Sequence, residues 1–390
     1  MAHARRRSWI RLTLLLTLGL AAAGRTAPAA PDPPPPPTTA GAYASASTCA
    51  ACHEAIHTYW SEGPHARAAT SPVFLAALER AGGKQPEARR GCVWCHSPTT
   101  LVTGDVALET PLSREGITCD FCHTVAEVDL DREGHPFTLD PGDIKRGPFE
   151  YAESVGHRTA YSPLHRASPL LCASCHEFTS PAGAAVLTTY SDWKAGPYPA
   201  RGVPCQDCHM APIPGSTVRE GLADRSLRVI NLHRVVGGSS RSQLARGLDL
   251  VIEPLKRSGG SAEVVVVVGN VAAGHPVPGG LATKSLVLTV GVEAPDGSLQ
   301  HVQERVYRRE LKDARGQVIR NVEDLYLRAA SVGRDNRIKP LERRRERFTL
   351  PLPAGARAVV ARLDYRDATD PASPVSTLRI TESRRPLDAR

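Results

Sequence analysis

The chain has 390 residues, which is enough for two domains with a buried core each. Aromatic residues make up only 5% of it, and dense aliphatic runs occur in only part of the sequence. One region therefore needs something other than side chains to fill its interior. The formal net charge of +8 falls to about +4 without the four arginines of the first 24 residues, which gives no case for nucleic-acid binding.

Residues 1–24, MAHARRRSWIRLTLLLTLGLAAAG, combine a basic start, an apolar run and small residues suited to cleavage. This pattern predicts a secretory signal peptide and an exported chain. The alternative, a membrane anchor, is weaker because the apolar run is shorter than the ~20 residues that a spanning helix needs. Arg6 and Arg7 also resemble a twin-arginine signal. Residues 25–42 are proline-rich and are predicted to be a linker.

All the cysteines lie between residues 43 and 238, and each falls in the same pattern, CxxCH. The five units are CAACH, CVWCH, CDFCH, CASCH and CQDCH, and their cysteines are Cys49, Cys52, Cys92, Cys95, Cys119, Cys122, Cys172, Cys175, Cys205 and Cys208. On one helical turn, positions i, i+3 and i+4 share a face, so two thiols and an imidazole project together. A planar macrocycle on that face would take the thiols as thioethers and the imidazole as an axial iron ligand.

The pattern therefore predicts five covalently bound c-type haems in residues 43–238, with proximal iron ligands His53, His96, His123, His176 and His209. A zinc site would use paired CxxC units without an adjoining histidine, and a redox CxxC would occur once. Disulfides are the other alternative in an exported protein, and the repeated histidine argues against them. Because haem is attached after translocation, the unfolded export route is favoured and Arg6-Arg7 is an ordinary basic segment. The haems would replace side-chain packing, so this part is predicted not to fold without them, and their propionates would bring the net charge near zero or below.

Methionine cannot supply most of the second axial ligands, because the sequence holds only Met1 and Met210 and Met210 adjoins a proximal histidine. Distal ligation by histidine is therefore predicted, and it favours lower potentials. The distal candidates are His65, His157, His165, His233 and His275. His57 lies one turn after a proximal histidine, on the same side of its haem, and His135 and His301 are predicted to be surface residues.

The sequence changes in character after residue 238. Residues 239–258 place Leu244, Leu248 and Val251 or Ile252 at helical spacing and are predicted to form a connecting helix. Residues 259–385 hold a β-branched run at 262–271 and alternating runs at 285–294 and 357–365, with turn signals between them. They predict an antiparallel β-sandwich. The fold class is thus α + β multidomain: a mainly helical and loop-rich multihaem domain, then the sandwich.

Several stretches between about residues 45 and 210 resemble the multihaem cytochromes of the cytochrome c-554 family, which accept electrons during hydroxylamine oxidation. They are Trp60 with PHARA, GITCDFCHTV, RGPFEYAESVGH, LCASCHEF and PCQDCHM. The resemblance implies closely packed haem pairs in which most irons carry two histidines. GHPVPGG resembles a GHxxPTG loop in a C-terminal domain of other multihaem cytochromes, although Gly279 replaces the threonine. The family's namesake has four haems, whereas this chain has five CxxCH units.

These observations predict a periplasmic protein, free or associated with the outer membrane, that carries electrons between redox partner proteins and has no transmembrane segment after signal cleavage. The alternative is a multihaem oxidoreductase acting on a small nitrogen or sulfur compound at one haem with an open distal position. The carrier is favoured because the sequence does not gather the acid, base or oxyanion groups of an active site. The sandwich could also be a docking module. The run LERRRERF at 341–348 could serve docking, but charged residues protecting an edge strand explain it better.

Overall fold

The structure is a computed structural model that describes residues 43–219, 222, 229–369 and 375–387. The signal peptide predicted for residues 1–24 and the linker predicted for residues 25–42 lie outside the described residues. In the described ranges, no helix combines the length and the apolar character needed to cross a bilayer.

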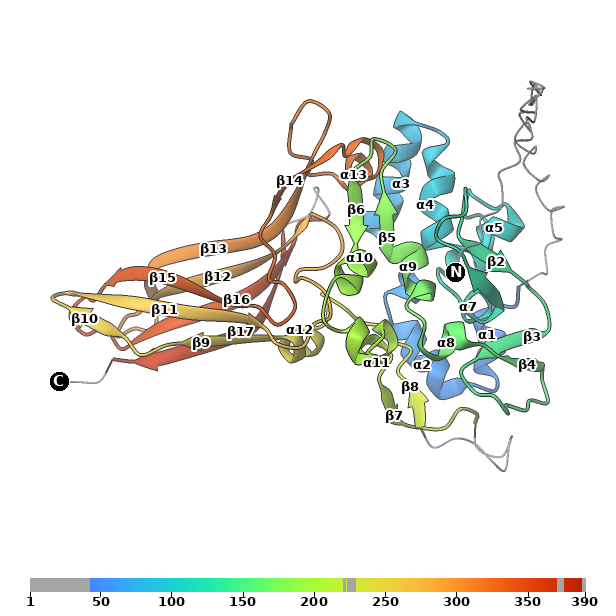
Figure 1. Cartoon of the computed structure of the whole chain (residues 1–390), viewed down its shortest axis with the longest axis horizontal. Helices are drawn as coiled ribbons and strands as arrows, with labels where there is room; N and C mark the ends of the chain where they lie inside the picture. Colours follow the sequence, from blue (N-terminus) through green and yellow to red (C-terminus); the bar gives the residue numbers. More distant parts are fainter. Residues whose placement is uncertain (1–42, 220–221, 223–228, 370–374, 388–390) are drawn as a thin grey trace, which may run out of the picture. The chain divides into compact units, whose positions relative to one another are not determined.

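Short helices and two-stranded sheets make up the part of the chain that carries the CxxCH units (Figure 1). Its longest described helix, α3 (Pro72–Lys84), has 13 residues, a length that is marginal for a helix alone in water. The other helices are α1 (Ala46–Ala50), α2 (Glu54–Glu62), η1 (His65–Arg67), α4 (Ala88–His96), α5 (Thr100–Thr103), α6 (Pro111–Arg114), α7 (Cys119–Thr124), α8 (Pro163–Ala167), α9 (Leu170–His176), α10 (Thr189–Lys194), η2 (Pro199–Arg201) and α11 (Cys205–His209). The strand pairs are β1 (Val125–Val128) with β2 (Phe137–Leu139), β3 (Ile144–Gly147) with β4 (Arg158–Tyr161), β5 (Glu177–Thr179) with β6 (Ala185–Thr188), and β7 (Pro212–Pro214) with β8 (Val229–Asn231).

The side-chain core of this part is divided into small clusters. One consists of Tyr43, Phe121, Val125, Phe137 and Leu164, and another of Ala69, Phe74, Leu78, Val93 and Leu108. By contrast, the core around the C-terminal strands joins 21 buried residues in a single cluster. This division agrees with the expectation that the N-terminal part needs more than side chains to fill its interior.

The connecting helix predicted over residues 239–258 is shorter than expected. Helix α12 spans Arg241–Gly247, and strands β9 (Leu248–Ile252) and β10 (Lys256–Ser258) follow at once. Leu248 and Ile252 are four residues apart, which is one helical turn but also an even number of strand positions. Strand β11 offers β9 a pairing partner, so Leu248 and Ile252 lie on a strand rather than a helix, and both side chains are still buried.

The C-terminal strands form two antiparallel sheets, as the alternating runs predict (Figure 1). One has the order β10-β11-β15, with β9 also paired to β11, and the other the order β14-β13-β12-β16-β17. The bounds of the strands not yet given are β11 (Ser261–Asn270), β12 (Lys284–Glu293), β13 (Leu299–Lys312), β14 (Ser331–Asp335), β15 (Arg343–Pro351), β16 (Ala358–Asp367) and β17 (Ser376–Pro386). The predicted inward faces are buried in the shared core: Leu286, Leu288, Val290 and Val292 on β12, and Val359, Ala361, Leu363 and Tyr365 on β16. The fold is therefore α + β multidomain, and the arginine-rich run lies on β15, which pairs with β11 along one edge only.

One helix of the C-terminal part leaves the sandwich and packs elsewhere. Helix α13 (Val322–Arg328) lies between β13 and β14 in the sequence and contacts α3 of the N-terminal part. Nearby, Arg309 on β13 donates hydrogen bonds to the carbonyls of Ala185 and Val186. The hydroxyl of Ser180 donates to the carbonyl of Ala329. These contacts join α13 and its flanking strands to the CxxCH-bearing part.

Candidate haem sites

Each CxxCH unit begins on a helical turn, as the spacing predicts. Helices α4, α7, α9 and α11 contain the whole motif, whereas in the first unit α1 holds Cys49 and His53 caps the start of α2. In α7 the turn is fixed locally, because the side chain of Thr118 accepts a hydrogen bond from the backbone N–H of Phe121. None of the ten cysteines is paired in a disulfide, so the disulfide alternative does not apply.

Seven histidines share one hydrogen-bond arrangement, in which the Nδ1–H donates to a backbone carbonyl. They are His53 to Thr217, His96 to Ala68, His123 to Arg146, His157 to Arg158, His209 to Val236, His233 to Asn231 and His275 to Pro276. Such a bond fixes the ring orientation and the tautomer, and it leaves Nε2 as the nitrogen with a free lone pair. These seven rings are therefore arranged as metal ligands are.

Four of the five motif histidines face a second imidazole at nearly the same distance. The ring centroids lie 6.3 Å apart for His53 and His157, 6.5 Å for His176 and His65, 6.5 Å for His123 and His233, and 6.4 Å for His209 and His275. A metal–imidazole nitrogen bond is about 2 Å long and the ring centroid lies about 1 Å behind that nitrogen, so two rings across one ion are separated by about 6 Å. The residues present therefore fit a haem iron held by two histidines.

Burial keeps several of these rings neutral. It lowers the pKa of His65, His176 and His233 to about 4. The pKa values of His123 and His275 are also lowered, again chiefly by burial. A neutral imidazole is the form that binds a metal ion.

His165, the remaining distal candidate, has a different geometry. Its ring stacks on that of His123 with the centroids 5.5 Å apart, closer than the four pairs above. Its Nε2 is hydrogen-bonded to the carbonyl of Cys122, and its Nδ1 is buried without a partner. The nitrogen that the other rings leave free is thus occupied in His165.

His96 in the second unit lacks a comparable partner. Its ring stacks on Phe74, with the centroids 3.9 Å apart and the planes 8° from parallel. Among the residues that the structure describes, no second histidine ring lies within pairing distance of it. The histidines that were not distal candidates lie elsewhere: His57 contacts Trp60, His135 contacts Phe137 and His301 is exposed.

Thiols from different units also lie in contact. Cys49 of the first unit lies beside Cys119 of the third, Cys95 of the second beside Cys175 of the fourth, and Cys172 of the fourth beside Cys205 of the fifth. Cys122 of the third unit and Cys175 of the fourth pack against the same apolar cluster. The attachment edges of the units are therefore close to one another.

Two kinds of site residue could not be found from the sequence. The carbonyls that orient the imidazoles belong to residues as different as Thr217 and Val236, because any residue supplies a carbonyl. Phe74, on His96, and Tyr326, packed beside Cys92, lie on helices whose only sequence signal is an apolar position at helical spacing.

Comparisons with known proteins agree with this geometry. Residues 48–124 match the family described as "Cytochrome c554 and c-prime". A solved structure, the penta-heme cytochrome c552 from Thermochromatium tepidum, superposes with a TM-score of 0.72 at 19% identity, covering 89% of this chain and 99% of that chain. This likeness shows a shared fold. A second solved structure, Northeast Structural Genomics Consortium target SoR45, has 10% identity and a TM-score of 0.17 over 36% of this chain and 87% of that chain, and it carries no weight.

No curated protein matches the chain in sequence. The family match covers three complete CxxCH units, and the other two units lie beyond it on helices α9 and α11. Covalently bound c-type haem is thus the cofactor, and redox partners are implied. Residues 48–124 thus match the cytochrome c554 family, within a fold that is shared with a penta-heme cytochrome c.

Proposed function

We propose that this chain is an exported pentahaem cytochrome that transfers electrons between redox partner proteins. Bound haem supplies reversible one-electron chemistry at its iron. Two observations support a count of five: the chain has five CxxCH units, and the solved structure it resembles is a penta-heme cytochrome. The four imidazole pairs carry the proposal, because two strong axial ligands suit electron transfer rather than substrate binding.

The proposed distal ligands follow from the pairs. His157 would complete the first unit, His233 the third, His65 the fourth and His275 the fifth. His165 would instead hold the ring of His123 in place by stacking on it, without binding the iron. The second unit would then have a proximal ligand, His96, and no second histidine.

The contacts between thiols support an order for the units. The first adjoins the third, the third adjoins the fourth, and the fourth adjoins both the second and the fifth. This order predicts a main route through the first, third, fourth and fifth units. The second unit would be a side branch at the fourth.

The domain organisation that we propose follows the sequence prediction, with one adjustment from the fold. Residues 1–24 would be the signal peptide, 25–42 the linker, 43–238 the pentahaem domain and 259–385 the sandwich. The connection between the two domains would be α12 at Arg241–Gly247, with β9 and β10 already part of the sandwich. The mature protein would work in the periplasm.

Electron paramagnetic resonance of the oxidised holoprotein, with the mass of the attached haems measured on the same sample, tests this function. We expect a mass increase of five haems, four low-spin components and one high-spin component. A mass increase of fewer than five would refute the pentahaem assignment. Five low-spin components would refute the open second unit and leave a pure carrier.

A second candidate function rests on the second unit alone. His96 stacks on Phe74 and lacks a second imidazole within the described residues, so the iron held there could bind a small nitrogen or sulfur compound. Adding nitrite, hydroxylamine, nitric oxide or sulfite to the oxidised protein should convert only the high-spin component. If none of the four changes that component, this candidate fails while the carrier function stands.

A further inference from the structure

Helix α13 brings residues of the sandwich part against the second CxxCH unit. Leu327 on α13 is buried together with Ala81 of α3 and Ala88 of α4, and Tyr326 and Cys92 pack against the same cluster. Cys92 is the first thiol of the second unit. A helix that belongs to the sandwich by sequence thus covers the attachment edge of a haem site in the other domain.

The closest approach is between Tyr326 and Gly91. A Cβ atom placed on Gly91 would lie 1.8 Å from the hydroxyl oxygen of Tyr326 and 2.9 Å from its ring carbon Cζ. No side chain larger than hydrogen fits there unless Tyr326 moves. Glycine disfavours a helix, yet Gly91 lies within α4 directly before Cys92. Only a residue without a side chain leaves room there for Tyr326.

Tyr326 also reaches towards the fourth unit. Its ring lies parallel to that of Phe178, with the centroids 4.7 Å apart and the planes within 3°. Phe178 follows the proximal histidine His176 by two residues, and Cys175 contacts Cys95 of the second unit. Tyr326 therefore lies between the second and fourth units, beside Cys92 and against Phe178.

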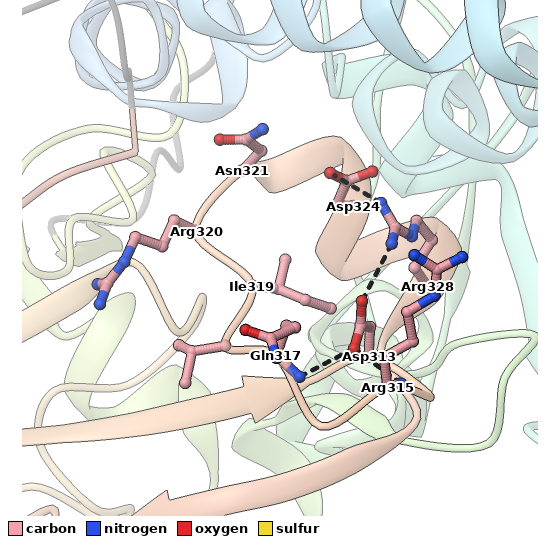
Figure 2. Close-up of a pocket in the computed structure, with 9 residues that line it drawn as sticks. Asp313, Arg315, Gln317, Ile319, Arg320, Asn321, Asp324 and Arg328 are labelled. Atoms are coloured by element: carbon pink, nitrogen blue, oxygen red, sulfur yellow. Dashed lines mark hydrogen bonds and ion pairs between the residues drawn. The ribbon is translucent and has the colours of Figure 1, made fainter.

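Charged residues hold α13 from both sides. Towards the haem part, the buried carboxylate of Glu323 lies 2.9 Å from the Nε of Arg80 and 3.5 Å from the Nζ of Lys84, and Lys84 also binds Asp324 at 2.8 Å. Towards the sandwich, Figure 2 shows Arg328 between Asp324 and Asp313, and its Nη2 lies 3.0 Å from Asp313.

The side chain of Glu323 is only 1% exposed, and its Oε2 has no hydrogen-bond partner. Its charge is therefore balanced by Arg80 and Lys84 through Oε1 alone. Losing either cation would leave a buried carboxylate undercompensated, which is costly. The position of α13 thus depends on a few specific ion pairs.

We propose that α13 is a latch that couples the sandwich to the second haem, with Tyr326 as the positioning residue that keeps water and small ligands away from its attachment edge. This inference rests on the proposed function, in which the second unit is the one without a second histidine. A seated α13 would hold the site dry and favour the reduced, less charged iron. By reciprocity, whatever unseats α13 would alter the potential of this haem and not of the other four.

The test uses the full-length holoprotein with Tyr326→Leu, Tyr326→Phe and, as a matched control on an exposed tyrosine, Tyr151→Leu. The reduction potential of each haem is followed by redox titration with paramagnetic resonance, and the rate of cyanide binding to the oxidised protein is measured. Tyr326→Leu should lower the potential of the high-spin haem alone and speed cyanide binding several-fold, while Tyr326→Phe keeps the ring and stays close to wild type. Equal behaviour of Tyr326→Leu and Tyr151→Leu would overturn the proposal.

A double-mutant cycle separates this proposal from the proposed function. Gly91→Ala should lower the thermal midpoint of the wild type clearly and that of Tyr326→Leu little, because the clash partner is then gone. If the wild type shows five low-spin haems, the assignment of an open second unit is wrong. The double-mutant cycle and the potential of the second haem would still decide whether α13 acts on that haem. The proposal would be wrong if the losses of thermal midpoint in the cycle were additive, or if Tyr326→Leu left the potential of the second haem unchanged.

Discussion

The imidazole rings of His209 and His275 lie 6.4 Å apart and within 9° of parallel, although one ends the fifth CxxCH unit and the other stands in a loop between two strands of the sandwich. Asn270, fully buried at the end of β11, fixes that loop because its side-chain amide donates to the carbonyl of His275. The sandwich thus places a side chain beside a CxxCH histidine. In the function we propose, this makes the sandwich part of the redox unit rather than only an appended docking module.

Replacing His275 with alanine should convert one low-spin haem to high spin. The proximal ligand His209 stays, since its Nδ1 bond to the carbonyl of Val236 is independent of His275. The potential of that haem should also rise, because it loses a strong ligand to the oxidised iron. Paramagnetic resonance of the oxidised protein measures both, with His301→Ala as the control on an exposed histidine. An unchanged low-spin count would remove His275 from the ligand set.

His233 and His165 should give opposite results although both rings lie beside His123. His233 has its Nε2 free at a centroid distance of 6.5 Å, whereas the Nε2 of His165 is held by the carbonyl of Cys122. His233→Ala should therefore add a high-spin component, and His165→Ala should leave the spin states as they are. The two variants, compared in the same spectrum, serve as controls for each other. The reverse outcome would exchange their roles.

The sequence predicted the helical turns of the CxxCH units better than the pairing of their histidines, for a physical reason. CxxCH is a local pattern, so the turns of α4, α7, α9 and α11 follow from the spacing alone. The pairing of His65 with His176 joins residues more than a hundred positions apart, and no local pattern encodes it. The alternation that predicted the strands of the sandwich is likewise a local pattern, and the predicted inward side chains are buried. The helix predicted over 239–258 failed because the spacing of Leu248 and Ile252 suits a strand as well, and only pairing with β11 decides between them.

The sandwich core should respond to cavity formation as a close-packed interior does. Leu288 is fully buried on β12 among 21 core residues, so Leu288→Ala should cost about 2–5 kcal/mol of unfolding free energy. The midpoint of the guanidinium transition, followed through amide exchange of β12 and β16, measures the loss. Val302→Ala, on a side chain 47% exposed, is the control and should change little. A loss no larger than that of the control would mean that the core repacks around the cavity.

Asp105 should stabilise the protein only above acidic pH. Partial burial tends to raise the pKa of its carboxyl, but hydrogen bonds from Thr110 and Glu109 outweigh this and lower it to about 2. Because the folded pKa lies below the ordinary value of 3.8 for an aspartate, the stabilisation is complete above about pH 4 and disappears as the pH falls towards 2. Asp105→Asn should thus lower the thermal midpoint at pH 6 more than at pH 3. The exposed aspartate variant Asp131→Asn is a suitable control, and a pH-independent difference would contradict the linkage.

Preventing haem attachment should unfold one part of the chain and spare the other. The CxxCH-bearing part divides its side-chain core into clusters such as that of Ala69, Phe74, Leu78, Val93 and Leu108, whereas the sandwich has a single core of 21 residues. Without the large apolar cofactor, the first part lacks the buried area that must offset its conformational entropy. Hydrogen exchange of the apoprotein should therefore show protected amides in β12 and β16 and fast exchange in α4 and α9. The holoprotein, measured in parallel, should protect all four elements. Native-like protection of α4 and α9 in the apoprotein would show that side chains alone fold this part.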